Sequence, residues 1–140
     1  MLVAKWNDTP AGVRIADEAG LKFYPDSDVV LSFWYDAELR GGVIYRDFTG
    51  RSCQMHVASF RRRWLTTAFL WEAFYYPFEI RQCEVVFGYI PSSNLTSQKF
   101  AYNLGFKLVS VIKDVFNDGD LLVLALYKDE CRFLAPPAWR

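Results

Sequence analysis

The sequence lacks an excess of charge of either sign and any long apolar run, and each absence excludes a class of protein. Its 140 residues include 16 basic and 16 acidic side chains, so the formal net charge is zero. A protein that binds nucleic acid usually presents a basic surface to the phosphates, so we expect no nucleic-acid partner. The apolar stretches are much shorter than the roughly 20 residues of a membrane-spanning helix, so we expect no membrane partner.

The sequence also has few cysteines, and we expect no secretory signal. The first five residues are not followed by the long apolar segment that a signal peptide requires. Cys53, Cys83 and Cys131 are odd in number and far apart, so they cannot all pair within one chain. They form no metal-ligand spacing, and we expect no metal site. A reducing cytoplasm is the expected location.

Apolar side chains, by contrast, are plentiful. They make up 52% of the sequence and the aromatic residues alone make up 18%. This composition supports a packed core and excludes a disordered chain. The length fits one domain over residues 1–140. The high aromatic content also suggests an interface, which leaves a homodimer open.

Hydrophobic periodicity and turn residues predict nine elements. Thr9 is the expected N-cap of the first helix, before Pro10. Pro77 should end the second helix, and Gly105 should cap the third in a left-handed conformation. The order predicts a mixed α/β (α+β) fold, with a mostly antiparallel central sheet and helices on both faces. The segments are a helix over 9–20, strands over 29–34, 41–47 and 52–58 with a polar turn over 35–40, a helix over 64–74, a strand over 83–90, a helix over 97–104, and strands over 106–112 and 121–127.

One stretch carries a family resemblance. Residues 94–106, Asn-Leu-Thr-Ser-Gln-Lys-Phe-Ala-Tyr-Asn-Leu-Gly-Phe, resemble a motif of the GNAT N-acetyltransferases: Asn, then Ser or Ala three residues later, then a helix that closes on Leu-Gly-Phe. The resemblance covers roughly residues 29–134. It implies a GNAT-like fold, acetyl-CoA as co-substrate, and the cytoplasm of a bacterial host. Further pieces resemble phage- and prophage-encoded members, namely His56-Val57-Ala58, Trp64-Leu65-Thr66, Tyr76-Pro77-Phe78, the turn at 118–120 and the tail at 129–134.

The resemblance places the pyrophosphate of acetyl-CoA at the start of the second helix, where unpaired backbone N–H groups favour an anion. The family usually has Gln or Arg, two residues, Gly, one residue, and then Gly or Ala. Arg61 fits the first position, but Trp64 and Thr66 replace the small residues. Alternatively, the three arginines form a solvated basic turn. The expected cofactor-binding residues of this region are Val57, Ala58, Ser59, Arg61, Arg62, Arg63, Trp64, Leu65 and Thr66.

The resemblance also implies that Asn94 and Ser97 contact the pantetheine arm, with Ser97 as general acid toward the thiolate leaving group. The alternative role for both residues is helix capping. Many members have a tyrosine acid seven residues after the Asn, where this sequence has Ala101. Tyr102 lies about 100° further round the helix and is not expected to replace it. An Ala there with an earlier Ser is closer to the subfamily that resembles ribosomal-protein N-terminal acetyltransferases.

His56 and Glu84 are the expected general bases. Strand alternation places His56 on one face together with Gln54 and Ala58, and a neutral imidazole suits proton transfer near pH 7. Glu84 is an unusual charge in an apolar run. His56 and Glu84 are on the two strands where the sheet is expected to splay around the thioester. Alternatively, His56 is structural, Glu84 pairs with an arginine or lies at the strand edge, or a water chain moves the proton.

The function that the resemblance implies is acetyl transfer to a primary amine of a protein or small molecule. The amine attacks the thioester directly, and a strand N–H stabilises the oxyanion. The alternative is a GNAT-fold binding module with impaired catalysis, which Trp64, Thr66 and Ala101 favour.

Overall fold

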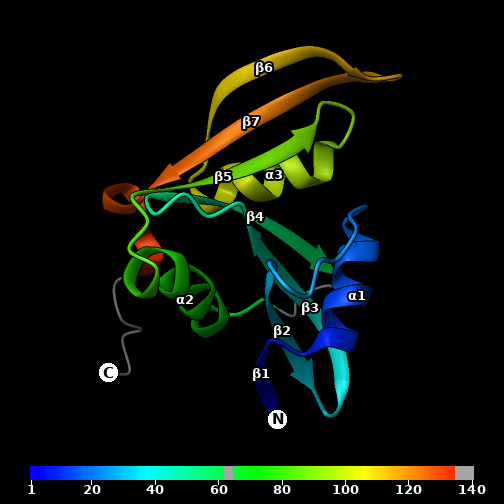
Figure 1. The fold of residues 1–140 in the computed structure, drawn as a ribbon, viewed down its shortest axis with the longest axis vertical. Helices are drawn as coiled ribbons and strands as arrows, with labels where there is room; N and C mark the ends of the chain where they lie inside the picture. Colours follow the sequence, from blue (N-terminus) through cyan, green and yellow to red (C-terminus); the bar gives the residue numbers. More distant parts are fainter. Residues whose placement is uncertain (62–64, 135–140) are drawn as a thin grey trace.

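The structure is a seven-stranded sheet with helices against both of its faces (Figure 1). The computed structural model describes residues 1–61 and 65–134. Within them, no helix is long and apolar enough to span a membrane. The elements are β1 (Leu2–Trp6), α1 (Thr9–Glu18), β2 (Val29–Tyr35), β3 (Glu38–Arg46), β4 (Ser52–Ser59), α2 (Thr67–Tyr75), the π-helical turn η1 (Tyr76–Ile80), β5 (Val85–Pro91), α3 (Leu95–Leu104), β6 (Lys107–Phe116), β7 (Gly119–Tyr127) and the 3₁₀ turns η2 (Lys128–Glu130) and η3 (Arg132–Leu134).

The sheet has the strand order β1-β2-β3-β4-β5-β7-β6. All neighbouring strands are antiparallel except β4 and β5, which are parallel. Side chains of α2 and α3 pack in one buried cluster on one face of the sheet, and side chains of α1 pack in a second cluster on the other face. The predicted fold class, a mixed and mostly antiparallel sheet between helices, is confirmed.

Three predicted boundaries differ from the structure near the N-terminal half of the sheet. Strand β1 has no apolar–polar alternation, because it is an edge strand with mostly exposed side chains, and it was not predicted. The N-cap of α1 is Asp8 and not Thr9, since Asp8 Oδ1 accepts a hydrogen bond from the Ala11 N–H at 2.9 Å. The predicted turn over 35–40 is too long. Asp36 and Ala37 both have positive φ and close the β2–β3 hairpin on their own.

The second and third helices follow the prediction more closely. Helix α2 ends at Tyr75, two residues before Pro77, but the chain then continues as the π-helical turn η1. Pro77 has no N–H to donate back into α2, and the Ala73 carbonyl four residues earlier accepts a hydrogen bond from the Tyr45 hydroxyl instead. Helix α3 ends at Gly105 with φ of 107°, which confirms the predicted left-handed cap.

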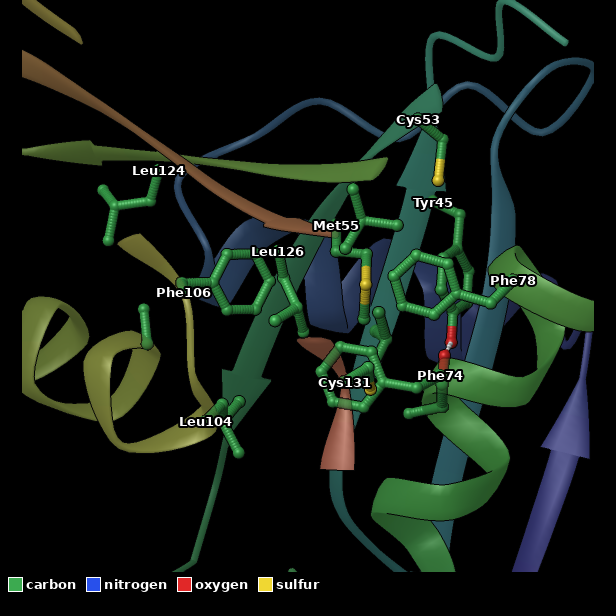
Figure 2. Packing of buried hydrophobic residues seen from close by; sticks show 14 of the residues in the cluster. Tyr45, Cys53, Met55, Phe74, Phe78, Leu104, Phe106, Leu124, Leu126 and Cys131 are labelled. Atoms are coloured by element: carbon green, nitrogen blue, oxygen red, sulfur yellow. Dashed lines mark hydrogen bonds between the residues drawn. The ribbon is translucent and has the colours of Figure 1, made fainter. Parts of the chain in front are cut away.

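The core beneath α2 is built from large aromatic side chains and contains the three cysteines. Figure 2 shows two of them, Cys53 and Cys131, beside Tyr45, Phe74 and Phe78. The buried Tyr45 hydroxyl donates a hydrogen bond to the Ala73 carbonyl at 2.6 Å, which ties α2 to β3. Burial raises the pKa of the thiols of Cys53, Cys83 and Cys131. All three are free and buried, so they stay protonated at neutral pH and offer no nucleophile.

Helix α1 approaches the sheet most closely at Gly42 of β3. A Cβ at Gly42 would overlap Ile15 Cδ1 and lie 2.6 Å from the Leu31 carbonyl oxygen. Because that oxygen belongs to the neighbouring strand, Gly42→Ala should lower the free energy of unfolding by roughly 1–3 kcal/mol, as overpacked cores do. Gly88→Ala is the matched control, since its Cβ would meet nothing nearer than 3.8 Å. Urea unfolding of both variants tests this, and equal losses would contradict it.

Candidate functional site

The site begins at a fork in the sheet. Strands β4 and β5 pair only through their first residues, with Gln54 opposite Phe87 as the last pair. Beyond that pair, β4 follows β3 as far as Ser59 and β5 follows β7 as far as Pro91, so the two strands diverge (Figure 1). Each strand therefore has one open edge. Within residues 1–61 and 65–134, alternate backbone N–H and C=O groups along these edges have no strand partner and can bind a ligand.

A cleft of about 390 Å³ occupies this fork, which is a usual size for a small-molecule site. Its walls come from the end of α1, residues 55–59 of β4, α2, residues 88–91 of β5, and α3. Met55 belongs to the core cluster under α2, whereas Ala58 belongs to the cluster under α1, and both line the cleft. The cleft therefore reaches both faces of the sheet. Within the described ranges, no group of acidic, histidine and cysteine side chains could hold a metal ion.

His56 lines this cleft, as expected for a base, and two polar neighbours orient it. Its Nε2 lies 2.9 Å from Gln54 Oε1, and Gln54 Nε2 donates to the Asp47 carboxylate. A carboxylate only accepts, so the amide presents its oxygen to the ring, which places the His56 proton on Nε2 and leaves Nδ1 as the acceptor. Burial and the charge of Arg46 lower the pKa of His56 to about 4. The imidazole is therefore neutral near pH 7.

The first two turns of α3 form another wall. Asn94 is the N-cap, and its Oδ1 accepts a hydrogen bond from the Ser97 N–H at 3.1 Å. Asn94, Ser97 and Ala101 all line the cleft, and Ser97 and Ala101 are one turn apart. Tyr102 is 43% exposed and lies outside it. The structure thus gives Asn94 the capping role that we left open, and this role is compatible with a ligand contact.

The loop before α2 is only partly described. Arg62, Arg63 and Trp64 lie outside the described residues, so the expectations for them stay predictions. Arg61 does not line the cleft; its Nε donates to a carboxylate oxygen of Glu38 at 2.8 Å, and its side chain is 61% exposed.

Two further residues of this loop have separate positions. Leu65 lines the cleft, whereas Thr66 does not. Thr66 caps α2 instead, because its Oγ1 accepts a hydrogen bond from the Phe69 N–H at 3.2 Å. The other N–H groups of the first turn of α2 lack intrahelical partners and favour an anion.

Glu84 is not where the sequence predicted it. It is exposed, precedes the first residue of β5, and its N–H donates to the Arg51 carbonyl at 2.7 Å. That position is on the paired side of the fork, whereas the cleft opens beyond Phe87. The expectation that Glu84 lies at the splay is therefore wrong, and no geometry supports it as a base.

Sequence reasoning missed the wall that α1 contributes. Glu18 and Ala19, at the end of α1, line the cleft together with β4. Nothing in the local sequence indicates that this helix end meets the fork, which lies some 40 residues further along the chain. Gly88, on β5, was also missed, although a glycine inside an apolar strand often marks a place where a ligand approaches the backbone.

Comparison with known proteins identifies the fold. No protein-family model matches the sequence, and no curated protein matches it. Solved structures do match. One is the ribosomal-protein-S18-alanine N-acetyltransferase from Escherichia coli, with TM-score 0.69 and 16% identity over 91% of this chain and 94% of that one. Another is a spermidine N-acetyltransferase from Vibrio cholerae, with TM-score 0.73 and 12% identity over 96% of each chain.

A third match is a GNAT family acetyltransferase from Elizabethkingia anophelis with acetyl-CoA bound, with TM-score 0.69 and 11% identity over 90% of this chain and 97% of that one. A fourth match is a structure described as a probable acetyltransferase, with TM-score 0.64 and 20% identity. The match covers 74% of this chain and 63% of the length of that one. The chain has the GNAT acetyltransferase fold, and the fold expected from the motif at residues 94–106 is confirmed.

Proposed function

We propose that the chain is an acetyl-CoA-dependent N-acetyltransferase that transfers the acetyl group to a primary amine by direct attack. The observation that carries this proposal is the cleft in the fork between β4 and β5, which reaches both faces of the sheet and holds His56 in its wall. Two reactants can then enter from opposite faces and meet within the sheet. The acetyltransferase fold of the neighbours, one of them with acetyl-CoA bound, supports the same chemistry.

The residues present fit acetyl-CoA. The open edge of β4 at residues 57 and 58 offers backbone groups to the amides of a pantetheine arm, and Gly88 leaves room beside β5. The N-terminus of α2 suits the pyrophosphate, and the arginines at 61–63, which the sequence places just before it, would add positive charge. For Arg61 this requires that the side chain leave Glu38, with which it pairs in this structure. Asn94 and Ser97 line the cleft beside this path. Acetyl-CoA supplies the activated thioester.

Three groups of the chain would then have separate roles in catalysis. His56 accepts a proton from the amine through Nδ1, Ser97 donates one toward the leaving sulfur, and a strand N–H at the fork stabilises the oxyanion. None of these steps needs a cysteine or a metal. An origin in a phage or prophage, a cytoplasmic location and a homodimer are further proposals that rest on the sequence alone.

Acetyl-CoA should bind with a stoichiometry of one per chain and raise the melting temperature by mass action. Titration calorimetry and thermal shift measure this, and release of free CoA thiol in the presence of primary amines measures turnover. The double variant Arg61→Ala/Arg63→Ala should bind acetyl-CoA more weakly than wild type. It should bind acetyl-pantetheine, which lacks the nucleotide and pyrophosphate, as the wild type does.

The outcomes separate the proposal from its alternative. If saturating acetyl-CoA produces no calorimetric heat and no thermal shift, the proposal is overturned. That result would favour a binding module on a GNAT fold. Binding without turnover on any amine would indicate a module whose catalysis is impaired. If the double variant loses affinity equally for acetyl-CoA and acetyl-pantetheine, the pyrophosphate does not bind at residues 60–66.

A further inference from the structure

The cleft has a single carboxylate in its described wall. Of the described side chains that line it, only Glu18, His56 and Tyr89 can ionise, and none is a lysine or arginine. His56 is neutral near pH 7, because burial and Arg46 lower its pKa to about 4. Glu18 is therefore the one acidic side chain in the described part of this wall, with no basic side chain there to oppose it.

Glu18 occupies a position that repels anions and attracts cations. It lies in the last turn of α1, where the helix carries partial negative charge, and no basic side chain offsets that charge in the turn. Among the described residues, the Glu18 carboxylate makes no hydrogen bond and no ion pair. A carboxylate here is unfavourable for the helix itself. It is free to meet a positively charged ligand in the cleft.

The two ends of the cleft differ in what they can accept. The end against α3 has Asn94 and Ser97, on the face where the resemblance places the pantetheine arm. The end under α1 contains Glu18. It lies on the face of the sheet to which Ala58 points, and strand alternation places His56 on that face as well. The acceptor and its base are thus expected on the α1 side, apart from the co-substrate.

We infer that Glu18 selects the acceptor, which enters past the end of α1 as a protonated aliphatic amine without a neighbouring carboxylate. Glu18 is a specificity-determining residue in this scheme, because it attracts the ammonium group and repels amines that carry an acid. The inference rests on the proposed function and names the substrate class of the same site.

Cadaverine and L-lysine form a matched pair of probes, because lysine is cadaverine with a carboxylate added. In calorimetry on the protein saturated with CoA, the wild type should bind cadaverine about five- to tenfold more tightly than lysine. The Glu18→Gln variant should lose most of this preference, because its affinity for cadaverine falls. Asp17→Asn is the control, since it removes the same charge one residue earlier, at a position that does not line the cleft.

Each result decides the matter. A wild type that binds cadaverine no better than lysine, or Glu18→Gln and Asp17→Asn variants with equal effects, would overturn the role of Glu18 while leaving acetyl-CoA binding intact. Failure of acetyl-CoA to bind the wild type would overturn the proposed function itself. Acetyl-CoA affinity should be the same in wild type and Glu18→Gln, which distinguishes loss of the acceptor from loss of the cleft.

Discussion

His56→Gln is expected to lower kcat/KM for acetyl transfer by roughly 100- to 10,000-fold, the usual contribution of a general base, and to leave acetyl-CoA affinity unchanged. An ammonium cannot attack a thioester, so a group in the cleft must take its proton. Of the two bases predicted from the sequence, only His56 lines the cleft, with Nε2 held by Gln54 and Nδ1 available. Steady-state kinetics and calorimetry on the same variant test both parts.

The pH profile gives the prediction a second measurement. Burial and Arg46 lower the pKa of His56 to about 4, against smaller opposing effects of Asp28 and Asp47. The active neutral form therefore predominates above pH about 4. The wild-type rate should rise through a single ionisation there, and His56→Gln should remove that limb. If the limb remains in the variant, a water or the amine itself carries the proton.

The same shift affects stability in a direction that can be checked without activity. The pKa of His56 in the folded protein lies below the value of about 6.5 in an unfolded chain. The unfolded state therefore binds more protons between these values, so the stability from this group is complete above pH 6.5 and is lost as the pH falls toward 4. The stability of the His56→Gln variant should decline less across this window in urea unfolding. An equal decline would show that His56 does not titrate as described.

Much of the fold could be predicted from local patterns. Gly105 and the apolar run of β5 carried enough information to place a helix end and a buried strand. Strand β1 could not be predicted, because an exposed edge strand needs no apolar alternation. The Asp36–Ala37 turn was missed as well, since alanine is an unusual residue at positive φ and no turn motif marks it.

The site was less predictable than the fold, and the reason is register. The sequence indicated that His56 and Ser97 face a cleft, because each belongs to a stretch that resembles the family or follows strand alternation. Whether Glu84 lies before or beyond the fork depends on how β4 and β5 pair, and only the three-dimensional structure fixes that pairing. The same holds for Glu18, whose role depends on where the end of α1 rests.

Ser97→Ala is expected to lower kcat about 100-fold, at the lower end of what a positioned acid contributes, with little change in acetyl-CoA affinity. Ser97 lines the cleft, and among the described residues its hydroxyl makes no hydrogen bond, so it can donate toward the leaving sulfur. Removal of the hydroxyl should not disturb the helix, because the capping bond uses the backbone. Single-turnover kinetics would separate the chemical step from product release.

Tyr102→Phe is the matched control, because it also deletes one hydroxyl from α3. Tyr102 is exposed and outside the cleft, whereas Ala101, the position at which the family resemblance would place a tyrosine acid, lies in the wall. The variant should therefore keep nearly the full wild-type kcat. A large loss in Tyr102→Phe with none in Ser97→Ala would mean that α3 turns its other face to the thioester. Full activity in both variants would mean that neither hydroxyl is the acid and that the thiolate leaves unprotonated, stabilised by the N-terminus of the helix.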